Sequence, residues 1–477
     1  LPKHIKDIIA LLPYLNGGLF AENEIDKLDI FISDELMKEI FEFLNRYNFT
    51  IVESLGFDKE VAVNPELIGT IYEKFVNLET TPELKEKYEA EGKTKGIIYT
   101  QEIEIDFMVK KAFIHYLQNN SNLSLQRIYN FIFDDIEDFE ISSPEEYETL
   151  KNLVENVKIV DPACGSGSFL IGIVNLLHDL HKKLLKYSPE ENPKEYAIRK
   201  HIIEENVYGV DVQDWAVKIA ELRLWLFLIV ESDLKREEIL FEPLLPNLSF
   251  KVRQGDSLIE EIGNIDMSFL RKDLKQIPPK IKTKITQLKK EKLKYTKNEK
   301  GHLSAKEIEK LELDIYRDLL EEKIKYLIEE TKKLRNSITK SIQSNELFKE
   351  TSDKNKEIFE KQKNRHQIEK EIEILKELKN NLKENKPFVW DIDFAEVFLD
   401  ENKKGFDIVI GNPPYVRQEK IAPPLLNERD FKPEQWGKLK KNYKEKLQKM
   451  VENLYGKPFK PDGKADLYVY FYFKSLS

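Results

Sequence analysis

The sequence is nearly without cysteine and is poor in methionine. Of its 477 residues only Cys164 is a cysteine, and four are methionines. A single cysteine excludes an internal disulfide and a cysteine-rich zinc site, and it favours a reducing, cytoplasmic location. We find no other ligand pattern typical of a metal site. The sequence therefore predicts a protein that depends on neither disulfides nor metal.

Long apolar runs are also absent. No stretch approaches the roughly 18 consecutive apolar residues that a membrane-spanning helix needs, so we expect no membrane partner. Residues 1–15 lack the basic start, apolar centre and small-residue cleavage site of a signal peptide. The chain starts at Leu1 rather than at a methionine, which indicates a fragment or a processed chain.

An excess of positive charge is the third absence. The chain has 76 Lys and Arg residues against 86 Asp and Glu residues, and its net charge is −10. This excludes a protein that is basic over its whole surface. It does not exclude a nucleic-acid enzyme, because binding depends on a local cationic face. With 41% hydrophobic and 11% aromatic residues, the chain can form a sizeable core in two or three domains.

Residues 1–95 show helical spacing and form the first predicted region. Amphipathic patterns cover residues 34–47 and 67–78, with a break at Asn16-Gly17-Gly18. Residues 97–118 predict a short extended segment followed by a helix, with Thr100 placed to cap that helix. The region as a whole indicates a helical domain and no particular function.

From about residue 157 the pattern changes to strands alternating with helices. Four short apolar segments, each ending in a polar turn, lie at residues 157–161, 207–211, 250–256 and 406–411. We expect the last of these to be a buried strand. This alternation predicts an α/β fold with a doubly wound, mostly parallel sheet.

A charged segment at residues 269–387 separates the third predicted strand from the fourth. Apolar residues recur in it at steps of three and four: Ile308, Leu311, Ile315 and Leu319, then Ile324, Leu327, Leu334 and Ile338. This spacing predicts a coiled-coil-like helical insert, with turns at residues 298–304 and 351–355. The insert is either a solvated spacer or an arm that contacts DNA or a partner. Its mixed charges favour the spacer.

The first candidate site is the glycine-rich turn at residues 161–168, DPACGSGS, between a strand and an apolar helix. Glycines there let the backbone approach a ligand above the strand ends. The turn lacks the lysine of a phosphate-binding loop. Its leading acid indicates a ligand with positive or hydroxylated groups, and S-adenosyl-L-methionine has both. The alternative is a turn without a ligand. The predicted cofactor contacts are Asp161, Ala163, Gly165 and Gly167.

Acids also end the next two strands. Asp211 lies where a ribose diol would bind, and the adjacent Val212 would cover one face of an adenine ring. Asp256 would accept a hydrogen bond from the cofactor's amino group. Each acid alone could be an ordinary loop carboxylate. Three acids at successive strand ends favour a cofactor site.

The fourth strand leads into Asn412-Pro413-Pro414-Tyr415. The two prolines fix the backbone and leave the Pro413 carbonyl able to accept a hydrogen bond, as the Asn412 side-chain oxygen also can. Two such acceptors suit the two hydrogens of one planar amine, and Tyr415 offers a surface for stacking. An ordinary Asn-Pro-Pro turn is the alternative. The preceding strand and the upstream acids disfavour it.

Residues 161–170 and 405–415 together resemble the cofactor and catalytic motifs of N6-adenine DNA methyltransferases. They are most similar to the long forms in type I and type IIG restriction–modification systems. Tyr99-Thr100 resembles an upstream motif near the methionine end of the cofactor, which implies cofactor contact by Thr100. Residues 466–471 resemble the motif after the catalytic one, and residues 16–20 and 388–390 also match the group.

The resemblance implies a Rossmann-like class I methyltransferase fold with its core in two parts, residues 96–268 and 388–477. It implies that the target adenine rotates out of double-stranded DNA. Asn412 and Pro413 would then hold N6, and Tyr415 would stack on the base. The amine would attack the methyl group directly, without a covalent intermediate, so Cys164 is expected to have a packing role.

Target recognition follows the catalytic part in this motif order, whereas the chain ends at Ser477. We therefore expect a truncated chain or a split gene, with a C-terminal target-recognition domain or a specificity subunit elsewhere. Residues 1–96 contain no convincing nuclease cluster, since Glu83-Leu84-Lys85 lies in a charged helical run. A nuclease is expected upstream, on a partner, or not at all.

Two alternative functions remain. The Asn-Pro-Pro-Tyr tetrad also occurs in enzymes that methylate RNA bases or protein glutamine. The DPACG opening and the insert favour DNA, within a restriction–modification or related phage-defence system. The chain could instead be an inactive cofactor-binding remnant or subunit, although its intact tetrad argues against loss of activity by design.

Overall fold

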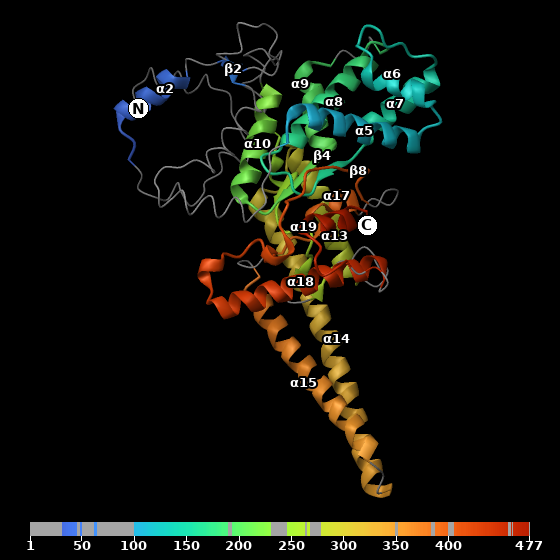
Figure 1. Cartoon of the computed structure of the whole chain (residues 1–477), viewed down its shortest axis with the longest axis vertical. Coiled ribbons are helices and arrows are strands. Elements are labelled where there is room, and N and C mark those ends of the chain that lie inside the picture. The colour runs from blue at the N-terminus through green and yellow to red at the C-terminus, as the bar shows by residue number, and fades with distance from the viewer. Residues whose placement is uncertain are drawn as a thin grey trace. The chain divides into compact units, whose positions relative to one another are not determined.

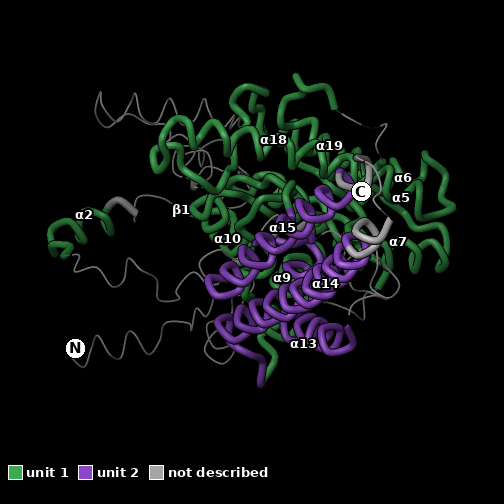
Figure 2. Tube along the Cα trace, turned by 90° about the horizontal axis from the view of Figure 1, so that it is seen from below, with its two compact units in different colours: residues 1–259, 294–300, 400–477 green, residues 260–293, 301–399 purple. Residues whose placement is uncertain are grey.

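The computed structural model describes residues 31–44, 48–49, 62–63, 100–188, 193–229, 246–262, 265–267, 278–348, 352–382, 387–398, 405–456, 459 and 461–476. The predictions at residues 16–20, 67–78 and 83–85 lie outside this described part. The chain divides into two compact units. Unit 1 comprises residues 1–259, 294–300 and 400–477, and unit 2 comprises residues 260–293 and 301–399 (Figure 2).

The N-terminal region is partly helical. Helix α2 (Asp34–Leu44) confirms the amphipathic helix predicted there. The helical prediction is wrong at β1 (Asn48–Phe49) and β2 (Ala62–Val63), which pair in parallel. Aromatic and β-branched residues such as Phe49 and Val63 favour extended backbone, which accounts for the difference.

Unit 1 contains a parallel four-stranded sheet in the order β5-β4-β3-β8. Its strands are β3 (Ile159–Asp161), β4 (Val207–Asp211), β5 (Val252–Gln254) and β8 (Ile408–Val409). All three strand pairs are parallel, so the predicted α/β arrangement is confirmed for these strands. Because the strands run in one direction, their carboxyl ends share one edge, where ligands of such sheets bind.

Strand β8 differs from its prediction as a buried strand over residues 406–411. It has two residues, and Val409 is 37% exposed. Within the described sheet β8 pairs only with β3, so it is an edge strand with a less covered face. The residues after β8 nevertheless remain next to β3, because the Ile410 N–H donates to the Val160 carbonyl at 3.0 Å.

Helices surround this sheet (Figure 1). In chain order they are α5 (Glu102–Asn120), α6 (Leu125–Phe133), α7 (Pro144–Asn156), α8 (Ser168–Leu185), α9 (Glu195–Glu205) and α10 (Asp214–Ile229). Phe113 and Leu117 of α5 pack with Leu177 of α8 in one buried cluster, and all three are fully buried. This cluster anchors the glycine-rich turn that precedes α8.

The helix capping predicted for Thr100 is wrong. Helix α5 begins at Glu102, and its N-cap is Gln101, without a side-chain capping hydrogen bond. The Thr100 hydroxyl instead accepts a hydrogen bond from Asn412. The Thr100 hydroxyl therefore bonds to a residue distant in sequence, although the local sequence predicted that it would cap the helix.

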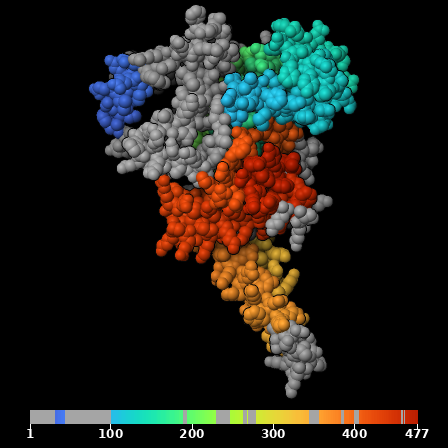
Figure 3. Space-filling model, in the orientation of Figure 1, coloured from blue at the N-terminus to red at the C-terminus, as the bar shows by residue number. Residues whose placement is uncertain are grey.

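The last part of unit 1 consists of α18 (Pro433–Tyr455) and α19 (Leu467–Ser475), whose outer surface belongs to the orange and red region of Figure 3. Leu447 and Val451 of α18 share a buried cluster with Tyr470 and Phe471 of α19 and with Val416. This cluster holds both helices beside the segment that follows Tyr415. Among the described residues, no helix combines the length and the apolar character needed to cross a membrane.

Unit 2 is largely helical. It contains β6 (Glu261–Ile262) paired with β7 (Ile265–Asp266), most of α13 (Pro279–Thr296), then α14 (Ala305–Phe348), α15 (Ser352–Asn380), α16 (Trp390–Asp393) and α17 (Ala395–Phe398). Helices α14 and α15 lie side by side (Figures 1 and 2). Ile308, Ile315 and Leu327 of the predicted apolar series are buried. The coiled-coil character of this pair stays a prediction.

One of the two turns predicted in the insert is confirmed. Residues 298–304 separate α13 from α14, with positive φ at Asn298 and Gly301. The turn at residues 351–355 is wrong for Ser352–Asn355, which form the start of α15. Serine, aspartate and asparagine favour the first turn of a helix as well as loops, so the sequence alone was ambiguous here.

Candidate cofactor and methyl-transfer site

The glycine-rich turn connects β3 to α8. Gly165 and Gly167 have positive φ values of 52° and 87°, which L-residues with side chains rarely adopt. A Cβ atom on Gly167 would also lie 2.9 Å from the Ala220 Cβ atom of α10. Glycine at position 167 thus permits both the turn and the close packing of α10.

Asp211, at the end of β4, holds this turn from the neighbouring strand. Its Oδ2 accepts a hydrogen bond from the Gly165 N–H at 3.0 Å, and its Oδ1 accepts one from the Gln213 N–H at 2.8 Å. A carboxylate oxygen can accept more than one hydrogen bond. The residue predicted to bind the ribose is therefore fixed in place at the wall of the cavity described below.

Asp161 is 1% exposed, and its Oδ1 accepts a hydrogen bond from the Ala163 N–H at 2.9 Å. Burial, together with the nearby charge of Asp211, raises the pKa of Asp161 to about 8, although the hydrogen bond from the Ala163 N–H lowers it. A positively charged ligand would compensate two such neighbouring acids. The electrostatics of the site therefore favour a cationic ligand.

Asp256 makes contacts that the sequence did not reveal. Its Oδ2 accepts a hydrogen bond from the Tyr443 hydroxyl at 2.7 Å, and its Oδ1 accepts one from the Leu258 N–H at 2.9 Å. Burial raises the pKa of Asp256, and these hydrogen bonds oppose that shift. Tyr443 lies on α18, 187 residues away. The sequence contained one signal for this contact. Tyr443 lies on the apolar face of α18, which favours a side chain directed into the protein.

The residues of the Asn-Pro-Pro-Tyr tetrad separate into two environments. The Asn412 Nδ2 donates to the Thr100 Oγ1 at 3.0 Å, which orients the amide oxygen away from Thr100. Among the described residues nothing donates a hydrogen bond to the Pro413 carbonyl. Tyr415 is 50% exposed, and its ring centroid lies 5.7 Å from that of Tyr468. The rings of Tyr415 and Tyr468 thus form an aromatic surface, which begins three residues after Asn412.

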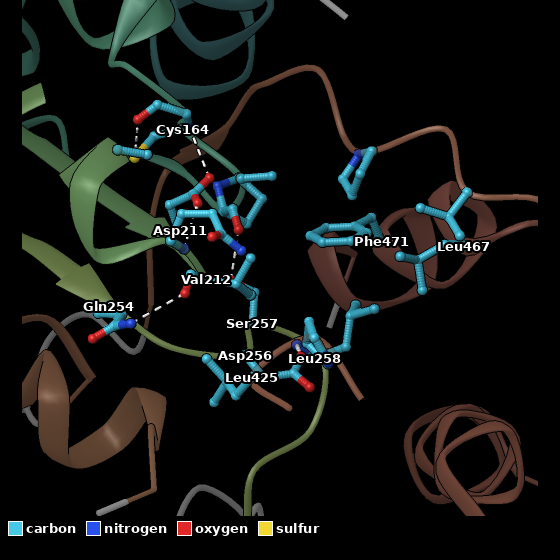
Figure 4. A pocket seen from close by; sticks show the side chains of 18 of the residues that line it. Cys164, Asp211, Val212, Gln254, Asp256, Ser257, Leu258, Leu425, Leu467 and Phe471 are labelled. Carbon is cyan, nitrogen blue, oxygen red and sulfur yellow. Dashed lines mark hydrogen bonds between the residues drawn. The ribbon is translucent and has the colours of Figure 1, made fainter. Parts of the chain in front are cut away.

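These residues enclose or border a cavity of about 950 Å³ in unit 1. Of the predicted site residues, its walls include Thr100, Asp161, Ala163, Gly165, Asp211, Val212, Asp256, Asn412 and Pro414, but not Gly167, Pro413 or Tyr415. Figure 4 shows Asp211 and Val212 on one side of the cavity and Leu467 and Phe471 on the other. The structure thus gathers residues from five separate segments of the chain.

Arg223 is a further residue that the sequence analysis missed. It is 1% exposed, and its Nη1 donates to the Ser166 carbonyl at 2.9 Å and to the Ser168 Oγ at 3.1 Å. These bonds stabilise the glycine-rich turn from α10. The available signal was an arginine in the otherwise apolar stretch Leu222–Ile229.

Neither a metal nor a reactive thiol is indicated here. The described part of the chain contains no group of three or more His, Cys, Asp or Glu residues able to hold a metal ion. Cys164 is 5% exposed, and burial raises the pKa of its thiol well above the usual value. A buried neutral thiol is a poor nucleophile, in keeping with the packing role expected for Cys164.

A parallel α/β sheet with acids and a glycine-rich turn at its carboxyl edge defines a nucleotide- or nucleoside-binding class of protein. Comparison with known proteins makes this class specific. The Eco57I restriction-modification methylase family matches residues 205–477, more than half of the chain, and the DNA-methyltransferase domain of MmeI matches residues 138–260. The chain therefore belongs to the Eco57I restriction-modification methylase family of DNA methyltransferases.

Individual relatives agree with this assignment. The chain is 33% identical to a putative type II restriction enzyme and methyltransferase of Methanocaldococcus jannaschii over 85% of the chain and 34% of that relative. It is 26% identical to DNA methyltransferase A of Bacillus subtilis over 47% of the chain and 20% of the relative. It is 31% identical to an adenine-specific methyltransferase of Streptomyces coelicolor over 22% of the chain and 8% of the relative. The chain spans about a third of the length of the first.

Proposed function

We propose that this chain transfers a methyl group from S-adenosyl-L-methionine to N6 of adenine in double-stranded DNA, within a restriction–modification system. The observation that carries the proposal is the hydrogen bond from Asn412 to Thr100. It fixes the amide of the tetrad at the wall of a cavity whose other walls include Asp161, Asp211 and Asp256. An amine-binding amide and a set of acids suited to the cofactor thus share one cavity.

The polar side chains and the size of the cavity fit the cofactor. S-adenosyl-L-methionine has a sulfonium cation, an amino-acid end, a ribose diol and an adenine ring. Asp211 would provide negative charge at the glycine-rich turn and accept the ribose hydroxyls, and a bound cation would favour ionisation of Asp161, whose pKa is raised by burial to about 8. Val212 and Phe471, from opposite sides of the cavity, would enclose the adenine. A volume of about 950 Å³ lies within the range of small-molecule sites.

When bound, the cofactor supplies an electrophilic methyl group on its sulfonium centre. The chain's own residues position the acceptor. The target adenine must leave the helix, at a cost of a few kcal/mol. The Asn412 Oδ1 and the Pro413 carbonyl would each accept one hydrogen of the adenine amine, and Tyr415 would stack on the ring. These bonds favour a more electron-rich amine nitrogen, and alignment provides most of the rate.

Cofactor binding is tested by calorimetry with S-adenosyl-L-methionine on the native chain and on Asp211→Ala. We expect binding by the native chain and its loss in the variant. Asp179→Ala is a matched control, because this acid is 67% exposed on α8 and lies outside the cavity walls. A folded native chain that does not bind the cofactor would contradict the proposal.

Methyl transfer is tested with cofactor carrying a labelled methyl group, using duplex DNA, RNA and protein as acceptors, followed by nucleoside analysis. We expect N6-methyladenine from DNA. In Asn412→Ala we expect a rate at least about 100-fold lower, comparable with the loss of one hydrogen-bonding group that stabilises a transition state. Faster labelling of RNA or protein than of DNA would reject DNA as the substrate.

The proposal also includes two partners. A further domain or a specificity subunit would recognise the target sequence, and a nuclease would accompany the methyltransferase. The name of the Methanocaldococcus jannaschii relative combines restriction enzyme and methyltransferase, which supports a nuclease partner. Mixing the chain with candidate subunits and measuring sequence-selective methylation tests this part. Unchanged selectivity with every subunit would argue against it.

A further inference from the structure

The segment after the tetrad has a charge opposite to that of the chain. Residues 417–449 contain ten Lys and Arg residues and five Asp and Glu residues, a net charge of +5, whereas the whole chain has −10. The remaining residues therefore have a net charge of −15. Positive charge is concentrated in the segment that leads from Tyr415 through α18.

Two exposed cations of this segment lie at the edge of the cavity. Lys420 and Arg429 are exposed and also line the cavity, so they lie at its opening. Lys432, Lys438 and Lys441 are exposed and follow within 12 residues. We call these five residues the cationic rim. Two of the five thus place positive charge at the opening of a cavity whose walls include several acids.

Helix α18 fixes the second half of the cationic rim to the site. Its inner face contributes Trp436 and Tyr443 to the cavity wall, and these side chains are 7% and 6% exposed. Lys438 and Lys441 lie on the same two turns of the helix but are exposed. Because the inner face is packed, these lysines have a fixed position relative to the cavity.

Three lysines of the cationic rim, Lys420, Lys438 and Lys441, have fewer close acidic partners than two lysines of α14. In α14, Lys325 lies 2.7 Å from Glu322, and Lys332 lies 2.8 Å from Glu329. Among the described residues, no ion pair within 4.0 Å involves Lys420 or Lys438, and Lys441 reaches Glu445 only at 3.9 Å. An external anion is therefore the natural partner of these side chains.

A second feature of α18 strengthens this argument. Lys440 and Lys444 are four residues apart, where like charges destabilise a helix by a few tenths of a kcal/mol. Burial lowers the pKa of Lys444, and the charge of Lys440 lowers it further, against Glu419. Like-charged lysines this close together on one helix are typical of a surface that binds a polyanion.

We propose that the cationic rim binds the phosphates of duplex DNA on either side of the target adenine. This inference rests on the proposed function, which requires a DNA base to enter the adjacent cavity. Phosphate contacts of Lys and Arg provide most of the sequence-independent affinity and orient the protein on the duplex. The cationic rim would thereby hold the strand while the base rotates.

The test measures binding of the full chain to a fluorescent duplex of about 20 base pairs at salt concentrations from about 50 to 200 mM. We expect affinity to fall with salt, as each neutralised phosphate releases counterions. The double variant Lys438→Gln/Lys441→Gln should bind more weakly, and the slope of log K against log salt should decrease in magnitude by about 2.

The double variant Lys332→Gln/Lys333→Gln removes the same charge from exposed positions of α14 and should leave the slope unchanged. An equal loss in both variants would show a general charge effect and overturn the proposal. Absence of salt-dependent duplex binding by the native chain, or preference for single-stranded RNA, would also overturn it. Calorimetry with S-adenosyl-L-methionine distinguishes failure of this proposal from failure of the proposed function. A chain that binds the cofactor but not duplex DNA would contradict the cationic rim alone.

Discussion

The Nδ2 of Asn412 donates a hydrogen bond to the Oγ1 of Thr100 across 312 residues of sequence, at 3.0 Å. Because an amide has one donor end and one acceptor end, this bond determines the direction in which the Asn412 oxygen points. Thr100 therefore positions the group that we propose to hold the target amine, in addition to lining the cavity.

Thr100→Val keeps the shape of the side chain but removes the acceptor. We expect the single-turnover rate of methyl transfer at saturating cofactor to fall about 10-fold, since a lost hydrogen bond costs on the order of 1–2 kcal/mol. Thr100→Ser keeps the hydroxyl and should restore most of the rate. If Thr100→Val weakened cofactor binding without changing the saturated rate, Thr100 would serve the cofactor alone.

Tyr443→Phe removes the hydrogen bond to the Asp256 Oδ2. We expect the dissociation constant of S-adenosyl-L-methionine to increase about 5- to 10-fold, because the carboxylate would lose an anchor worth about 1 kcal/mol. Tyr455→Phe is the matched control. Tyr455 lies on the same helix, and its hydroxyl donates to the Phe473 carbonyl at 2.7 Å, but it does not line the cavity. Equal effects of both variants in calorimetry would contradict a specific role for Tyr443.

The sequence predicted those parts of the site that depend on local pattern. Strand alternation and polar strand ends identified Asp161, Asp211 and Asp256, which lie along one edge because parallel strands share a direction. The same reasoning gave the parallel sheet of unit 1. Local pattern was sufficient here, because each acid is the last residue of its strand or lies within two residues of the strand's end.

The sequence could not predict contacts between distant segments. Thr100 was assigned to a cap because a threonine before a helix usually caps it, whereas its partner is Asn412. Tyr443 and Arg223 bind the site from helices whose packing is not encoded in any short motif. These residues became visible only when the fold brought the segments together.

Gly411, which follows β8, lies against the side chain of Asp161. A Cβ atom at this position would lie 2.2 Å from the Asp161 Oδ1, and Asp161 is buried with little room to move. We expect Gly411→Ala to destabilise the protein by about 1–3 kcal/mol and to displace Asn412, with loss of methyl transfer.

Gly437→Ala is the control for this substitution. Gly437 lies within α18 with no atom within 4 Å of an added Cβ, so the change should stabilise the protein by up to about 1 kcal/mol. Urea unfolding of both variants measures these effects. If Gly411→Ala were as stable and active as the native chain, the close approach of Gly411 to Asp161 would not constrain the site.

Asp161 predicts a pH dependence of stability. Its pKa is raised by burial to about 8, whereas an aspartate in the unfolded chain has a pKa of about 3.9. Between these values the folded protein retains a proton that the unfolded chain has lost. The contribution of Asp161 to the free energy of unfolding therefore falls as pH rises from about 4 to about 8, by up to about 1.4 kcal/mol per pH unit.

Asp161→Asn removes this titration and keeps an oxygen that can accept from the Ala163 N–H. We expect the variant to gain stability relative to the native chain as pH rises from 5 to about 8, as measured by urea unfolding. Asp430→Asn, at an exposed position, should follow the native pH dependence. Parallel curves for Asp161→Asn and the native chain would show that Asp161 is already ionised in the folded protein. Its negative charge would then be present before any cationic cofactor binds.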